Sequence, residues 1–290
     1  GRTDFSVGGR ACGGFSGYVY IFYNDGSIPT TAGTADVSIS SSGGLLDLYF
    51  GESLAAGDFN TDGKTDLAVG SPAAASNGNV YIFYNDGSIP TTAATADITI
   101  TGESVNNSFG ISLSSGDFNA DGKTDLAVGA LGFSSSTGRA YIFYNDGSIP
   151  TTTGTADVAI NGESGSYFAC FLSLGDFNAD SKTDLVVGAY NYSSFTGRAY
   201  IFYNDGSIPT TAATADVIIT GEMTNSYFGT SLVSGDFNAD GKTDLAVGAY
   251  GYSTNTGRVH VFITEAKVEE SLQQLKSKGT FKAKGSYQVK

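Results

Sequence analysis

Apolar and polar residues alternate over short stretches along most of this chain. Between Ser108 and Gly162, apolar or small residues fill 109–118, 125–130 and 139–144, and strict alternation follows at 157–162. Alternation with a period of two residues is typical of a half-exposed strand, and short apolar runs rich in β-branched and aromatic residues are typical of buried strands. Asn-Asp-Gly and Thr-Gly separate the runs, as turns do. The pattern therefore predicts four short antiparallel strands.

This four-strand unit recurs along the chain about every 60 residues. The run Tyr-Ile-Phe-Tyr-Asn-Asp-Gly-Ser-Ile-Pro-Thr-Thr starts at Tyr20, Tyr81, Tyr141 and Tyr200. The run Gly-Asp-Phe-Asn-x-Asp-x-Lys-Thr-Asp-Leu starts at Gly57, Gly116, Gly175 and Gly235. A repeated unit of four antiparallel strands matches one blade of a β-propeller. A β-solenoid is the alternative, although its turns are shorter and its strands are parallel.

The number of blades follows from the second strand of each unit, which begins at Asp4, Asp66, Asp125, Asp184 and Asp244. Residues 1–4 align with the end of an Asp-rich loop, so the first unit lacks its first strand. The last unit has a third strand at 258–262 and then loses the repeat, so we expect it to lack its fourth strand. The sequence predicts an all-β propeller domain of about five blades over 1–263, incomplete at both ends. Either the tail helps to close the ring of blades, or these blades are part of a larger ring.

The tail, 264–290, differs from the repeats in charge and in pattern. It holds six Lys and three Glu, whereas 1–263 holds 9 basic and 26 acidic residues. Val268, Leu272 and Leu275 recur with helical spacing and Gly279 follows, which predicts a helix at about 265–278. Alternation between 281 and 289 then predicts short strand segments.

Composition excludes several classes of function. The net charge of −14 disfavours a phosphate-backbone partner, so we expect no nucleic-acid binding. No apolar run approaches the 18 or so residues of a membrane span. The two cysteines, Cys12 and Cys170, lie in different repeats, and whether they pair stays open.

The Asp-rich loops carry the strongest chemical signal. Each places oxygen side chains at positions 1, 3, 5 and 9, with the backbone carbonyl of a Lys available at position 7. Calcium takes six to eight hard oxygen ligands, and this spacing supplies them from one turn. A turn without metal is the alternative, at the cost of repulsion among three carboxylates. We therefore predict about four Ca²⁺ ions, held by Asp58, Asn60, Asp62, Lys64, Asp66, Asp117, Asn119, Asp121, Lys123, Asp125, Asp176, Asn178, Asp180, Lys182, Asp184, Asp236, Asn238, Asp240, Lys242 and Asp244.

Position 6 of these loops requires a left-handed backbone. Gly63, Gly122 and Gly241 supply it, but the third loop has Ser181 there. A side chain in this conformation is strained, so we expect the third loop to be the weakest site. Position 12 is Val rather than a bidentate Glu, which distinguishes the loops from an EF-hand.

With these loops and strands, the chain resembles the FG-GAP repeat, which forms the blade of the integrin α-subunit propeller and of bacterial and archaeal surface proteins. The residues that carry the resemblance are Phe50-Gly51, Phe109-Gly110, Phe228-Gly229, Gly70-Ser71-Pro72, Gly129-Ala130, Gly188-Ala189 and Gly248-Ala249, while Phe168-Ala169 differs. The resemblance covers 1–263 and implies a calcium-binding propeller. The family ring usually has seven blades, so five is a departure.

Propeller topology places the Asp-rich loops and the Asn-Asp-Gly turns on one face. The opposite face carries the connections that vary between units, and the resemblance implies that ligands bind there. Rigid aromatics among small polar residues suit recognition of a protein or a glycan. We predict a ligand site there, although packing between blades is the alternative use of the six aromatic residues Phe133, Tyr190, Tyr192, Phe195, Tyr250 and Tyr252.

Catalytic signals are weak. The single histidine, His260, stands where other repeats have Tyr, so we expect a structural role. Three recurring Arg residues face a recurring Glu, which predicts ion pairs between Arg139 and Glu103, Arg198 and Glu163, and Arg258 and Glu222. The sequence thus favours a calcium-binding adhesion or ligand-binding module, not an enzyme, that is extracellular or at the cell surface. The alternatives are a non-catalytic module of a secreted polysaccharide-active enzyme and a structural subunit of a surface layer or filament; the oligomeric state is open.

Overall fold

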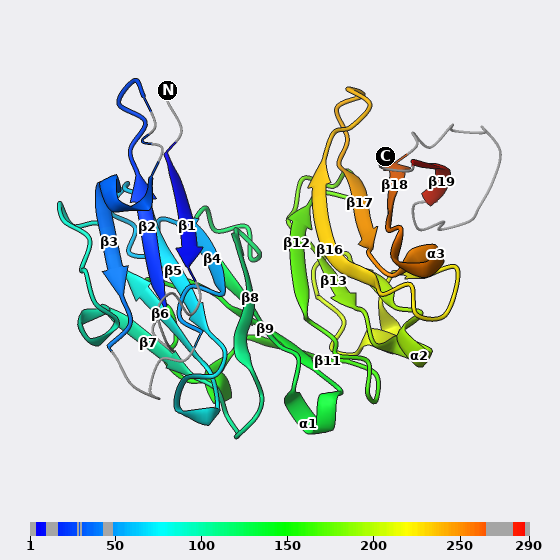
Figure 1. Ribbon diagram of the computed structural model, residues 1–290, viewed down its shortest axis with the longest axis horizontal. Coiled ribbons are helices and arrows are strands. Elements are labelled where there is room, and N and C mark those ends of the chain that lie inside the picture. The colour runs from blue at the N-terminus through cyan, green and yellow to red at the C-terminus, as the bar shows by residue number, and fades with distance from the viewer. Residues whose placement is uncertain are drawn as a thin grey trace.

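The computed structural model describes residues 4–9, 17–27, 29, 31–42, 49–264 and 281–287. These residues form nineteen strands in five antiparallel sheets arranged side by side (Figure 1). Within each sheet the strand order follows the chain, so every sheet is an up-and-down blade. The predicted all-β propeller with five blades is confirmed.

The blades are numbered here from the N-terminus. Blade 1 contains β1 (Phe5–Gly9), β2 (Tyr18–Phe22) and β3 (Val37–Ser40). Blade 2 contains β4 (Ser53–Gly57), β5 (Asp66–Ser71), β6 (Asn79–Phe83) and β7 (Ile98–Thr101). Blade 3 contains β8 (Phe109–Gly116), β9 (Asp125–Ala130), β10 (Arg139–Phe143) and β11 (Val158–Asn161). Blade 4 contains β12 (Phe171–Gly175), β13 (Asp184–Ala189), β14 (Arg198–Phe202) and β15 (Val217–Thr220). Blade 5 contains β16 (Phe228–Gly235), β17 (Asp244–Ala249), β18 (Arg258–Thr264) and β19 (Phe281–Tyr287).

The hydrophobic core lies between blades rather than within them. Strand β10 shows how alternation builds it: Tyr141 and Phe143 pack toward blade 2, whereas Ala140 and Ile142 pack toward blade 4. Because both faces of a blade are covered, the second strands β5, β9 and β13 are buried along their whole length. Four such cores join the five blades in series.

The glycines of the second strands allow neighbouring blades to approach closely. A Cβ atom added at Gly129 would lie 2.1 Å from the carbonyl oxygen of Ala169, and one at Gly70 would lie 2.1 Å from that of Gly110. The Phe of each Phe-Gly pair is buried in the same interface, as Phe109 shows. The Phe-Gly pair and the second-strand glycine, which recur from blade to blade, therefore form a packing motif between successive blades.

The two ends of the array behave differently. Blade 1 has three strands, as predicted. Blade 5 has four, because β19 pairs with β18, so the prediction that this blade lacks its fourth strand is wrong. The tail supplies this strand at the edge farthest from β16, and the described residues of the tail, 281–287, do not pair with blade 1. The helix predicted at about 265–278 lies outside the described residues.

Among the described residues, one face of blade 5 has no neighbouring blade, and side chains that are buried in the other blades are exposed there. The second residue of each Asp-rich loop is buried in blades 2, 3 and 4, where Phe59, Phe118 and Phe177 are at most 1% exposed. The same residue of blade 5, Phe237, is 49% exposed. In Figure 1, blades 1 and 5 lie at opposite sides of the molecule, so the described residues form an open arc.

Short helical segments occupy the connections. Those between second and third strands are α1 (Phe133–Ser136), α2 (Tyr192–Phe195), α3 (Tyr252–Asn255) and η3 (Ala74–Ser76). Those between third and fourth strands are η1 (Ala32–Thr34), η4 (Ala93–Thr95), η5 (Thr153–Thr155) and η6 (Ala212–Thr214). Segment α1 contains Ser134 and Ser135 at φ 48° and 56°, so it is a left-handed turn.

Candidate functional site

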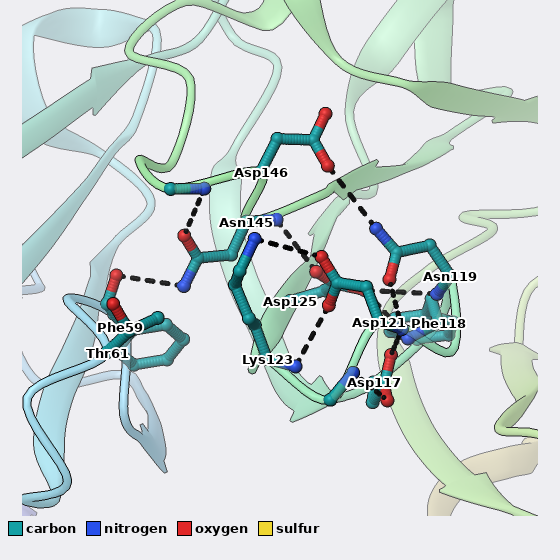
Figure 2. A network of polar contacts seen from close by, with 12 residues as sticks. Phe59, Thr61, Asp117, Phe118, Asn119, Asp121, Lys123, Asp125, Asn145 and Asp146 are labelled. Carbon is teal, nitrogen blue, oxygen red and sulfur yellow. Dashed lines mark hydrogen bonds and ion pairs between the residues drawn. The ribbon is translucent and has the colours of Figure 1, made fainter.

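The Asp-rich loops join the first and second strands of blades 2 to 5. Figure 2 shows the loop of blade 3, in which the two oxygens of Asp117 accept the backbone N–H groups of Asp121 (3.1 Å) and Gly122 (2.8 Å). Asn119 Oδ1 accepts the same Asp121 N–H at 3.0 Å. The oxygens at positions 1 and 3 therefore converge on one point of the loop. The other three loops repeat these contacts.

The aspartate at position 9 faces the interior instead. Asp125 is fully buried, and its two oxygens accept the N–H groups of Phe118 and Asn145, each at 2.7 Å. It thereby joins the start of its loop to the turn after the third strand (Figure 2). This structural role was not predicted. The sequence holds one hint, because Asp4 is present in a blade that lacks the first half of the loop. In the structure Asp4 keeps the contact to the turn after the third strand, where it accepts the Asn24 N–H.

In the loop of blade 3, the environments of positions 5 and 9 shift the pKa values of the two carboxyls in opposite directions. Burial raises the pKa of Asp125, and it raises that of Asp184 to about 6. The backbone N–H of Lys123 lowers the pKa of the exposed Asp121. Burial therefore disfavours the charged form of Asp125, whereas hydrogen bonding favours the charged form of Asp121.

The donor types of each loop suit calcium, but the side chains are held by hydrogen bonds to the backbone. Lys123 Nζ lies 3.1 Å from Asp121 Oδ2, so its ammonium folds back onto the loop rather than pointing to solvent. Across the described part of the chain, no three Asp, Glu, His or Cys side chains gather as a metal cluster. The oxygens of positions 1 and 3 are brought together, whereas position 9 points to the core. The predicted calcium ligands stay a prediction.

Left-handed backbone recurs in every loop, at two positions. Gly122 has φ 84° at position 6, and Ser181 adopts φ 67° there despite its side chain. Position 4 is left-handed too, with φ between 59° and 61° at Thr61, Ala120, Ala179 and Ala239. Nothing in the sequence signals this second position, because Ala and Thr are not typical of such backbone.

The turns after the third strands lie beside the Asp-rich loops, as predicted. Asn60 Nδ2 lies 3.3 Å from Asp86 Oδ1, and Asn119 Nδ2 lies 3.5 Å from Asp146 Oδ1. Asn145 Nδ2 also donates to the carbonyl of Phe59 in blade 2, so this face carries hydrogen bonds between blades (Figure 2). In Figure 1 the loop between β16 and β17 lies at the top and α2 at the bottom, on the opposite face.

Three of the six predicted ligand-binding aromatics lie against arginine. The guanidinium carbons of Arg139, Arg198 and Arg258 lie 3.5–3.7 Å from ring centroids, respectively those of Phe133, Tyr192 and Tyr252. Each arginine also pairs with its predicted glutamate at 2.8–2.9 Å, which confirms those ion pairs. These three rings stabilise the left-handed turns through cation–π contacts.

The other three aromatics belong to a layer of rings that spans blades 4 and 5. Tyr250 stacks on Tyr227 with centroids 4.6 Å apart, and Phe195 lies 4.9 Å from the same ring. Tyr190 lies 6.3 Å from Tyr227 and 5.4 Å from Tyr167. Tyr250 is 57% exposed, so the layer both packs between blades and faces solvent. Sequence reasoning missed Tyr167 and Tyr227, although each directly precedes the Phe of its first-strand motif.

Two reactive residue types have structural positions. His260 is 8% exposed and contacts Phe228 and Phe262, in agreement with its predicted structural role. Cys170 is a buried free thiol that donates to the Gly188 carbonyl, and burial raises its pKa to about 12. Cys12 lies outside the described residues.

Comparison with known proteins identifies the repeat. The FG-GAP repeat matches residues 50–83, 109–143, 171–202 and 228–262. Integrin alpha-5 of Xenopus laevis is 30% identical over 224 residues, which is 72% of this chain and 20% of that protein. Integrin alpha-PS2 of Drosophila melanogaster is 32% identical over 70% of this chain and 15% of its own length. Phosphatidylinositol-glycan-specific phospholipase D of Bos taurus is 31% identical over 48% of this chain and 18% of its own length.

The chain therefore spans a fifth or less of these relatives. In the part of the chain that the structure describes, no helix is both long and apolar enough to span a bilayer.

Proposed function

Because the chain is an FG-GAP repeat protein with an integrin-like propeller, we propose that it is a calcium-stabilised adhesion or ligand-binding module outside the cell or at its surface. The observation that carries this proposal is the partly exposed aromatic layer, Tyr167, Tyr190, Phe195, Tyr227 and Tyr250, opposite the Asp-rich loops. Rigid aromatic rings give contact area at little cost in side-chain entropy. The partner is a protein or a glycan, and we propose no catalytic role for the chain.

Calcium has a structural part in this proposal. The residues that would hold it are those at positions 1, 3, 5 and 9 of each loop, with the position 7 carbonyl. A bound divalent cation would neutralise carboxylates that otherwise repel one another. Since Asn145 and Asn204 donate to loop carbonyls of the preceding blades, firmer loops would also stabilise contacts between blades.

The face that binds is testable with point variants. Immobilised extracellular-matrix proteins and a glycan array serve as probes in millimolar calcium. Tyr250→Ala removes the most exposed ring of the layer and should weaken binding at least fivefold, because truncated aromatic anchors commonly cost more than about 1 kcal/mol. Asp146→Ala on the other face is the control and should leave binding unchanged. The opposite result would place the ligand site on the Asp-rich face.

One relative favours a second candidate function. The resemblance to a phosphatidylinositol-glycan-specific phospholipase D fits a non-catalytic module that accompanies a catalytic domain. The full reading frame of the gene distinguishes the two, because a hydrolase domain in the same polypeptide would favour the second.

A further inference from the structure

The face that carries the aromatic layer contains an open cleft at blade 3. Its volume is about 570 Å³, and it is lined by residues 104–108, Leu131, Gly132, 134–136 and Tyr167. Every polar side chain in this lining is Ser, Asn or Tyr, and none carries a charge at neutral pH. The cleft therefore offers neutral hydrogen-bonding groups rather than an ion site.

The cleft exists because blade 3 has small side chains where the next blades have aromatic ones. Ser108 precedes the motif Phe at the position that Tyr167 and Tyr227 occupy in the following blades, and all three residues share φ 52–53°. The backbone is thus the same and the side chain alone differs. Ser136 likewise stands where α2 has Phe195, whose ring packs on Tyr227.

A buried amide in the lining lacks a partner. Asn107 is 2% exposed; its Oδ1 accepts the Ser104 hydroxyl at 2.8 Å, but its Nδ2 has no hydrogen-bond partner. The next two blades have Ser166 and Ser226 there, and both hydroxyls donate to backbone carbonyls. Buried polar groups are nearly always hydrogen-bonded, so an unpaired donor beside a polar cleft points to an acceptor supplied from outside.

We propose that this cleft binds a neutral carbohydrate, which rests on the proposed function and names its ligand class. Sugar hydroxyls both donate and accept, and the serine hydroxyls and asparagine amides of the lining offer the same mixture. Asn107 Nδ2 donates to a sugar oxygen. Tyr167 adds aromatic surface for the apolar face of a pyranose ring, and it packs on Tyr190, which holds it in place. The absence of a cationic group in the lining disfavours acidic sugars.

The test fills the cleft with the side chains that the neighbouring blades already use. Neutral hexasaccharides of glucose, xylose, mannose and galactose are immobilised, with oligogalacturonate and heparin as acidic comparators. We expect the wild-type chain to bind at least one neutral oligosaccharide. The double variant Ser108→Tyr/Ser136→Phe should bind it at least tenfold more weakly with an unchanged melting temperature. Asn107→Ser should weaken binding about threefold or more.

The matched control places the same Phe at the equivalent position of blade 5, where Asn255→Phe should leave sugar binding unchanged. Binding that prefers the acidic comparators, or that survives filling of the cleft, would overturn the inference. So would binding to matrix proteins alone; if Tyr250→Ala still abolishes that binding, the proposed function stands without the sugar. Failure to bind any sugar or protein probe would overturn both.

Discussion

Ser181 combines a side chain with a backbone conformation that favours glycine. Its φ is 67°, and its N–H still donates to Asp176 Oδ2 at 2.8 Å, as the glycines of the other loops do. A left-handed L-residue costs about 1 kcal/mol relative to glycine. Ser181→Gly should therefore stabilise the fold by about that amount, raise the melting temperature by about 2 °C, and tighten calcium binding in the third loop roughly fivefold. Thermal melts and calcium titration measure both effects.

The reverse change in the neighbouring loop is the control. Gly122 has φ 84° and no heavy atom within 4 Å of an added Cβ, so Gly122→Ser introduces the strain without a clash. It should destabilise the chain by a similar amount. If neither variant shifts the melt, backbone strain does not limit these loops.

His260 makes the stability of blade 5 depend on pH. Burial lowers the pKa of His260 below the usual value of about 6.5. The carboxylate of Glu222, 3.9 Å away, raises the pKa, but by less than burial lowers it. Arg258 lowers the pKa further. The unfolded chain thus binds a proton more readily than the folded chain, so stability is fully present above about pH 6.5 and falls as the pH drops toward the folded pKa.

We expect the wild-type melting temperature to fall more steeply between pH 7 and pH 5 than that of His260→Tyr. Tyrosine occupies the same position in the four other blades, so the variant should fold. Parallel pH profiles of the two proteins would contradict a titrating His260.

At the scale of the element, the contact between Gly129 and the Ala169 carbonyl tests the packing of neighbouring blades. A Cβ added at Gly129 would lie 2.1 Å from that backbone oxygen, so Gly129→Ala must push blades 3 and 4 apart. Overpacking of this kind costs about 1–3 kcal/mol. Gly154→Ala is the control, because it meets nothing within 4 Å at an ordinary φ. Urea unfolding should show a loss in the first variant alone, and equal midpoints would mean that the interface adapts.

The elements themselves were largely predictable. The expected ranges 125–130 and 139–144 agree with β9 and β10 to within one residue, because apolar periodicity is set by burial on both faces of a blade. The fourth strand of blade 5 was not assigned to that blade, because 281–287 lacks the repeat pattern and pairs through its backbone. The left-handed turns were missed because Ser134 and Ser135 carry no glycine signal. The position 9 aspartates were predicted as calcium ligands, but spacing alone does not reveal that Asp125 joins two connections.

At the scale of the whole molecule, charge and connectivity both bear on the proposed role of calcium. The chain carries a net charge of −14, and four bound Ca²⁺ ions would reduce it to about −6. The four inter-blade cores are arranged in series along an open arc, and blade 5 leaves Phe237 exposed at its free face. No closed ring of the described blades compensates for a loosened loop. Repulsion among loop carboxylates therefore acts on each interface separately.

Removal of calcium should destabilise the fold markedly. Extracellular-type sites bind with Kd values of about 10⁻⁴–10⁻³ M. At about ten times Kd each site adds roughly 1.4 kcal/mol, or about 6 kcal/mol for four independent sites. For a chain of this size that corresponds to a fall in melting temperature on the order of 10 °C in EDTA. Excess calcium should restore the melt, whereas the same concentration of sodium chloride, adjusted for ionic strength, should not. Restoration by salt alone would assign the effect to screening, and an unchanged melt in EDTA with no calcium by elemental analysis would refute metal binding.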